Sequence, residues 1–194
     1  MPVWPDWQAF RQALLRPEGR IADPRDGRHD TVSEAQAYAL FFALVGNDRP
    51  AFDALLDWTE RELSQGDLGA QLPAWHWGRD ERDRWRVLDG NAASDADLWI
   101  AYVLTQAARL WHRPDWLGQA RRLARLILQR ETAELPGMGL QLLPGPVGFL
   151  DHQGNARLNP SYLPLPVLRW WAVHGGDPAW GRLLDGSLQL LRQA

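Results

Sequence analysis

Residues 31–45 read TVSEAQAYALFFALV. After a polar start, the segment is apolar almost without interruption, so a helix over these residues would have no polar face. A helix that is apolar on nearly all sides belongs in a protein interior. We therefore expect a buried helix over residues 31–45, with other segments packed around it.

The segments on either side alternate in character between mostly apolar and amphipathic. Residues 51–63 carry Phe52, Leu55, Leu56 and Trp58 on one side and polar residues on the other, and residues 115–130 have a basic outer face. Apolar helices covered by amphipathic ones are the pattern of an α/α toroid, with an inner and an outer ring. The sequence contains no repeat of fixed period, so it does not favour a solenoid. We expect an all-α chain with further helices over 7–15, 94–111, 159–174 and 178–193.

Three connections separate these helices. Residues 19–30 form a loop rich in Gly, Pro and Asp, and residues 137–158 contain short extended runs that favour a hairpin. Residues 65–90 form a long connection that carries Trp75, Trp77 and Trp85. Long ordered loops in compact domains are usually functional, so this connection is a candidate part of a site.

The composition excludes several classes of function. The 194 residues suit one domain, 1–194, with a net charge of −3 and no basic stripe that would bind nucleic acid. No cysteine is present, and no pair of histidines has metal-ligand spacing on one helix, so we expect no metal and no cofactor. No apolar run is long enough for membrane insertion, and residues 1–7 do not read as a signal peptide.

Tryptophan is the unusual residue, with 12 in the chain. Core packing is the commoner role of any single Trp, but the flat ring also stacks on the C–H face of a sugar. The abundance therefore permits a carbohydrate site without requiring one.

Two segments place carboxylates at the start of a helix. They are Thr31-Val-Ser-Glu34 and Ser94-Asp95-Ala-Asp97. The first is a capping box and the second resembles one, so capping of the helix N-terminus is the simpler interpretation. Asp95 fits it less well, because Asp97 already occupies the capping position.

The alternative is glycoside hydrolysis, in which two carboxyl groups flank a glycosidic bond. Inner helices that start at one rim of a toroid would aim Glu34 and Asp95 into the same cleft. A helix N-terminus lowers the pKa of a carboxyl group, whereas a general acid needs a raised pKa. Burial and a neighbouring carboxylate would have to outweigh the helix dipole.

Several motifs together resemble glycoside hydrolase family 8. The run Ala93-Ser-Asp-Ala-Asp-Leu-Trp-Ile-Ala101 is similar to the family signature, and Ser33-Glu-Ala-Gln-Ala-Tyr38 to its Ser-Glu-Gly-Gln-x-Tyr motif, with Ala35 in place of Gly. Segments 72–78 and 158–163 also match. Asn47-Asp-Arg49 and Asp57-Trp-Thr59 resemble the branch found beside bacterial cellulose-synthesis genes.

The resemblance implies an (α/α)6 barrel and an inverting endo-β-1,4-glucanase without a cofactor. It implies Glu34 as the general acid and Asp95 as the residue that binds and distorts the sugar at the cleavage point. Trp75 matches a stacking platform, with Trp77 as the neighbour that could be confused with it, and Tyr162 faces the cleft. The remaining substrate-site candidates, Gln36 and Asp97, would support the two carboxylates from behind.

The general base of the family is an Asp in a later motif that resembles Asp-Ala-x-Arg. This sequence contains no such motif, and Asp151 and Asp177 stand in other contexts. About seven helices are expected where a closed toroid has twelve. We therefore expect the N-terminal part of the fold, an incomplete toroid with little or no cellulase activity by itself.

Other interpretations remain open. The chain could be a non-catalytic carbohydrate-binding or structural remnant of the same fold, and related specificities in the family include mixed-linkage glucan, xylan and chitosan. The resemblance implies β-1,4-glucan (cellulose) as partner, a functional link to a cellulose synthase complex, and a periplasmic or secreted location.

Overall fold

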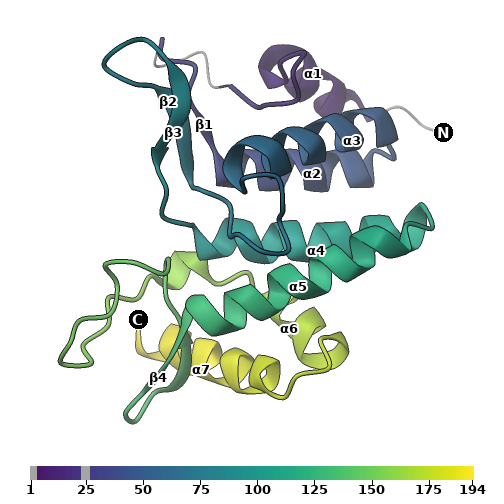
Figure 1. Ribbon diagram of the computed structural model, residues 1–194. Coiled ribbons are helices and arrows are strands. Elements are labelled where there is room, and N and C mark those ends of the chain that lie inside the picture. Colours follow the sequence, from purple (N-terminus) through teal and green to yellow (C-terminus); the bar gives the residue numbers. More distant parts are fainter. Residues whose placement is uncertain (1–3, 23–26) are drawn as a thin grey trace.

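The computed structural model describes residues 4–22 and 27–194, so part of the loop expected over 19–30 lies outside it. The described chain is mostly helical, which confirms the all-α prediction (Figure 1). A π-helical turn, Thr59–Leu63, continues α3, and a 3-10 turn covers Pro160–Tyr162. The helices are α1 Pro5–Leu14, α2 Ser33–Val45, α3 Arg49–Trp58, α4 Ser94–Leu110, α5 Pro114–Arg130, α6 Leu165–His174 and α7 Ala179–Gln193.

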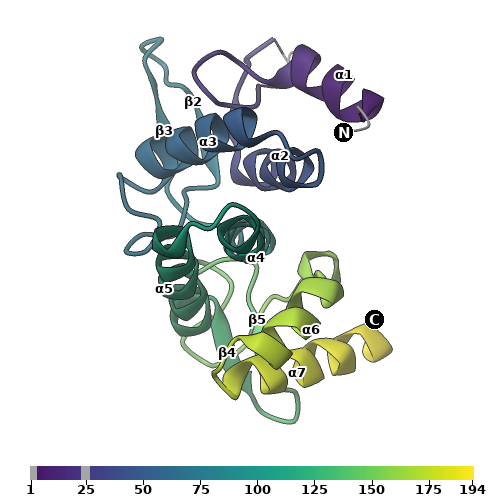
Figure 2. The same cartoon turned by 90° about the vertical axis from the view of Figure 1, so that its right-hand side faces the viewer.

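The helices stack in pairs along an open arc. Helix α2 contacts α4, and α4 contacts α6, so these three form an inner row. Helices α3, α5 and α7 each pack on the inner helix that precedes them. Figure 2 shows the three pairs following one another along a curve. The alternation of apolar and amphipathic segments therefore predicted the arrangement correctly, and the described residues form part of a toroid.

The pairs are held together by a continuous apolar core. Its largest fully buried side chains include Phe52 of α3, Leu98 and Leu104 of α4, and Leu123 of α5. Phe52 lies against the rings of Trp111 and Trp116, with centroid distances of 5.0 and 5.4 Å. In the part of the chain that the structure describes, no helix combines the length and apolarity that a membrane span requires.

A three-stranded antiparallel sheet covers the start of α2, and the sequence analysis did not predict it. Its strands are β1 Thr31–Val32, β2 His76–Arg79 and β3 Trp85–Asp89, in that order. Thr31 pairs with Trp77 and Val32 with His76. Residues 31–32 therefore belong to a strand, and α2 begins at Ser33. The strands are short and β3 is largely exposed, so the two-residue period that reveals a strand is weak.

The hairpin expected within 137–158 exists, but it begins earlier. Strands β4 Thr132–Leu135 and β5 Gly139–Leu142 pair antiparallel, with Thr132 opposite Leu142. Strand β5 packs against α7. The segment from Leu143 onward then continues as a loop, which runs back to the N-terminus of α4, where the Ser94 amide donates to the Pro144 carbonyl at 3.1 Å.

The contact between α7 and β5 gives a sharp test of packing. A Cβ atom on Gly186 would clash with the backbone carbonyl of Leu140, whereas a Cβ on Gly181 of the same helix would meet nothing. We expect Gly186→Ala to destabilise the protein by about 1–3 kcal/mol through overpacking. Gly181→Ala, the matched control, should stabilise it by about 0.5–1 kcal/mol through helix propensity. Urea unfolding of both variants measures the difference, and equal effects would contradict the packing.

Candidate active site

Glu34 lies in the first turn of α2, half-buried, at a point where two hollows meet. One pocket of about 290 Å³ is lined by Glu34, Trp75, Asn91 and Tyr162, among others. A second, of about 600 Å³, is lined by Glu34 and Tyr38, by apolar residues that include Phe10 and Phe42, and by the polar side chains of Arg28, Asp30 and His76. Glu34 therefore borders open space on two sides, as a group that reaches across a chain-like ligand would.

The predicted capping roles are wrong. Val32 and Ala93 occupy the N-cap positions of α2 and α4, and neither helix has a side-chain cap. The Thr31 hydroxyl instead donates to the Ile21 carbonyl at 2.7 Å. The adjacent strand and loop decide where these helices begin, since the Ser33 amide donates to the carbonyl of Trp75. Glu34 and Asp95 are thus not used as caps.

Asp95, in the first turn of α4, lies within electrostatic reach of Glu34. Burial, and after it the charge of Glu34, raises the pKa of Asp95 to about 6. Burial together with the charges of Asp95 and Glu34 also raises the pKa of Tyr38 and of Tyr162. The two carboxyl groups and two phenols therefore share one environment, although they come from α2, α4 and the turn before α6.

The pocket contains a Trp ring held in a defined orientation. The Asn91 amide donates to the Asp89 carboxylate at 2.9 Å, and this bond, followed by the interaction with the Trp75 side chain, lowers the pKa of Asp89. The Trp75 ring lies 4.8 Å from that of His76 at an interplanar angle of 31°. A ring held by contacts with Asp89 and His76 loses little conformational freedom when it binds a flat apolar surface such as a sugar face.

Trp77, unlike Trp75, is not among the residues that line this pocket. Its side chain is buried, edge-on to Trp58 at 5.2 Å and stacked on Trp85 at 4.8 Å. Residues two apart in a regular strand share a face, but the strand pairing shifts register between His76 and Trp77. Trp75 and Trp77 therefore separate, one to the pocket and one to the core.

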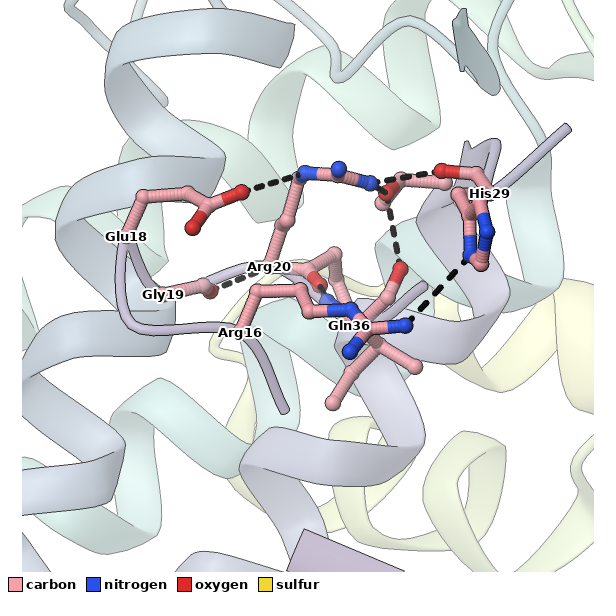
Figure 3. A network of polar contacts seen from close by, with 8 residues as sticks. Arg16, Glu18, Gly19, Arg20, His29 and Gln36 are labelled. Atoms are coloured by element: carbon pink, nitrogen blue, oxygen red, sulfur yellow. Dashed lines mark hydrogen bonds and ion pairs between the residues drawn. The ribbon is translucent and has the colours of Figure 1, made fainter. Parts of the chain in front are cut away.

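Gln36 is also a structural residue. It is fully buried, and its amide accepts from the Ile21 amide at 2.6 Å and donates to Gly19 O at 3.2 Å (Figure 3). A further donation to Thr59 Oγ1 at 2.9 Å joins α2 to the end of α3. Residues two apart on a helix lie on opposite sides, so Gln36 points away from Glu34. It therefore holds the 19–21 segment in place and cannot contact a substrate.

Asp97 is also buried. It stands two residues after Asp95 on α4 and therefore lies on the opposite side of the helix. Its side chain has no exposed surface, and it lies beside the equally buried carboxyl group of Glu131. The structure thus rules out direct substrate contact by Asp97 but leaves it close enough to Asp95 for their charges to interact. Glu131 was not recognised in the sequence.

Other pocket residues also escaped the sequence analysis. Tyr38 could have been found, because it stands four residues after Glu34 and so shares its helix face. Asn91 binds the backbone of Val147 through both its amide nitrogen and oxygen, at 3.0 and 3.2 Å, and thereby closes one wall of the pocket. Phe149 lies in the loop that Asn91 anchors, and nothing local in the sequence marks it.

Within residues 4–22 and 27–194, no group of three His, Asp or Glu is placed to hold a metal ion. The pocket instead combines the half-buried carboxyl group of Glu34 with the Trp75 ring, and the Asp95 carboxyl group, whose pKa is raised, lies within electrostatic reach of Glu34. The sequence model of the glycosyl hydrolases of family 8 matches residues 2–194. The chain belongs to glycosyl hydrolase family 8.

Similar proteins agree with this family assignment. The chain is 47% identical over 191 residues to an endoglucanase of Xanthomonas axonopodis pv. citri and 45% identical over 189 residues to one of Escherichia coli K12. These alignments cover 98% and 97% of this chain but 50% of each relative. The chain therefore spans about half the length of the family 8 relatives it matches.

A solved structure shows the same arrangement of helices. The endo-1,4-D-glucanase of Vibrio fischeri ES114 superposes with a TM-score of 0.93 at 45% identity, over 97% of this chain and 55% of that one. An endo-β-1,4-glucanase from Acetobacter xylinum gives 0.85 at 30% identity. The family 8 fold is thus present here over about half of its length.

The pKa of Asp95 leads to a test of the pocket that requires no substrate. A carboxyl group whose pKa is raised on folding costs stability as the pH rises from its unfolded value near 4 to its folded value near 6. Asp95→Asn removes this cost. The Tm advantage of the variant over wild type should grow between pH 4 and pH 6 and then stay level. Thermal unfolding across this range measures it, and a constant difference would contradict the raised pKa.

Proposed function

We propose that this chain is the acid-bearing part of an inverting endo-β-1,4-glucanase. The observation that carries the proposal is the placement of Glu34 and Asp95 in one environment, beside the oriented ring of Trp75. Relatives at 45–47% identity are named endoglucanases, and this supports β-1,4-glucan as the substrate.

Each pocket residue has a role in this proposal. Glu34 protonates the glycosidic oxygen as the bond to the leaving sugar breaks. Asp95 binds and distorts the sugar at the cleavage point, while Trp75 and Tyr162 contact neighbouring rings. In an inverting enzyme a second carboxylate, about 6.5–9.5 Å from the acid, activates water on the opposite face of the sugar. We propose that this general base lies outside residues 1–194.

Three Asp residues support that proposal, because each is held by hydrogen bonds from neighbouring groups, although Asp89 also lines the pocket. Asp89 accepts from the Asn91 amide and interacts with the Trp75 side chain. Asp151 is exposed and organises its own loop, accepting from the Gln153 and Asn155 amides at 2.8 Å. Asp177 accepts from the Ala179 amide at the start of α7. A function limited to carbohydrate binding is therefore the second candidate for the chain by itself.

One experiment separates the two candidates. We expect the 194-residue chain to bind cellopentaose, seen as a change in Trp fluorescence, and to lose that change in Trp75→Ala, while Trp85→Ala serves as a control outside the pocket. Turnover should be slow, because a general base contributes about 10²–10⁴-fold to the rate. Fast release of reducing ends would mean that a base lies within these residues, and a chain that does not bind would contradict both candidates.

We propose further that the protein acts outside the cytoplasm, in functional association with a cellulose synthase. The support is the resemblance of residues 47–49 and 57–59 to the branch found beside cellulose-synthesis genes, and the external location of the polymer. Fractionation of the producing cells tests the location, and co-purification with synthase subunits tests the association.

A further inference from the structure

Two carboxyl groups lie behind the pocket and take no part in the chemistry proposed above. Asp97 belongs to the first turn of α4, and Glu131 directly follows α5. Neither residue has exposed surface. The Glu131 carbonyl accepts from the Leu143 amide at 2.8 Å, so this residue sits where α5, α4 and the loop after β5 come together.

The carboxyl groups of Asp97 and Glu131 lie within hydrogen-bonding reach of each other. Among the described residues, no other group donates to any of their four carboxyl oxygens. An ionised carboxyl group can only accept, so a hydrogen bond between two of them requires a proton on one. Two ionised carboxyl groups in contact, buried and without a cation, would carry a large desolvation cost together with their mutual repulsion.

The neighbouring charges further disfavour ionisation of Asp97 and Glu131. The strongest external charges on the pair are negative, from Asp95 of α4 and Glu34 of α2. The loop residues 143–145 are uncharged, Arg130 at the end of α5 is exposed, and Glu134 of β4 is exposed and paired with Arg182. Burial and these neighbours raise the pKa of both Asp97 and Glu131 well above the ordinary range.

We propose that Asp97 and Glu131 share one proton at neutral pH and act as a positioning pair for Asp95. Their hydrogen bond ties the N-terminus of α4 to the end of α5, and their single remaining charge acts on the carboxyl group of Asp95. The benefit to catalysis rests on the proposed function, whereas the shared proton does not. Interaction between titrating groups is reciprocal, so the effect of Asp95 on the pair implies an equal effect of the pair on Asp95.

The shared proton is tested by unfolding the 194-residue chain in urea between pH 7 and pH 8. A proton that the folded state retains and the unfolded state loses lowers the folding equilibrium constant about tenfold per pH unit. We expect this slope in wild type and in Glu134→Gln, an exposed control. The double variant Asp97→Asn/Glu131→Gln, whose amides can still hydrogen-bond, should lose it. If the double variant does not fold, Glu131→Gln alone replaces it.

The coupling to Asp95 is tested by ¹³C NMR titration of the Asp95 carboxyl group. Burial and the charge of Glu34 raise the pKa of Asp95 to about 6 in wild type. The charge that we propose for the pair would favour the protonated form as well, so the pKa should fall in the double variant, which lacks that charge. If the pair had only a structural role, the double variant would be less stable than wild type by the same amount at every pH. The pH slope of unfolding and the pKa of Asp95 would then be the same in both proteins. That result, in either measurement, overturns the proposal. Neither measurement involves glucan, so failure of the proposed function would be seen separately.

Discussion

Glu34→Gln is expected to lower the turnover of cellopentaose by about 10²–10⁴-fold in any preparation of the protein that cleaves it. Glutamine keeps the size of the side chain and its neighbours in the pocket, but it has no proton to give to the leaving oxygen. The loss should therefore fall on kcat, with oligosaccharide binding nearly unchanged. Reducing-end assays and Trp fluorescence titration measure the two quantities.

The leaving group supplies an internal control for this prediction. An aryl cellobioside with a dinitrophenolate leaving group needs little protonation when its bond breaks. If Glu34 is the general acid, the variant should be far less impaired on this substrate than on cellopentaose. Equal losses on both substrates would instead point to a role in binding or in activating water.

Phe52→Ala is expected to have the largest effect on stability. Phe52 of α3 has no exposed surface and lies against Trp111 and Trp116, so it joins the first helix pair to the second. Truncating a buried Phe to Ala costs about 3–5 kcal/mol through lost transfer energy and the cavity left behind. For a chain of this size that lowers Tm by about 6–20 °C, which thermal unfolding by circular dichroism measures.

Val173→Ala is the matched control, because Val173 also lies on a helix but is 75% exposed. The free energy of unfolding of this variant should lie within about 0.5 kcal/mol of the wild-type value. A small loss for Phe52→Ala would mean that the α2–α3 pair is not packed against α4 and α5 as described. A large loss for Val173→Ala would mean that this exposed side chain is covered in solution.

Asp95 is the carboxyl group near Glu34 whose pKa is raised, and the causes are burial and a neighbouring carboxylate. For the general acid, Glu34, burial and a second carboxylate were expected to overcome the helix dipole. Both causes operate at Asp95, with burial the larger and Glu34 the next. The buried position of Glu131 beside Asp97 could not be anticipated, since Glu131 lies far from Asp97 in the sequence and in no recognisable motif.

The local residue pattern was enough to predict most of the helices and their inner or outer position. Helical periodicity and apolar content are local properties, so residues 33–45 and 94–110 could be assigned to the interior without knowledge of their neighbours. The two carboxylates at helix starts, and the family that their motifs resemble, were readable for the same reason.

Which side chains meet in the pocket depends instead on contacts between distant parts of the chain. Trp75 and Trp77 have the same chemistry two residues apart, and a register shift in strand pairing sends one outward and one inward. Gln36 and Asp97 lie in the right motifs, but both are fully buried, because each stands two residues after Glu34 or Asp95 and so faces the opposite side of its helix. Strand pairing and burial depend on segments far apart in the chain, and local spacing carries no information about them.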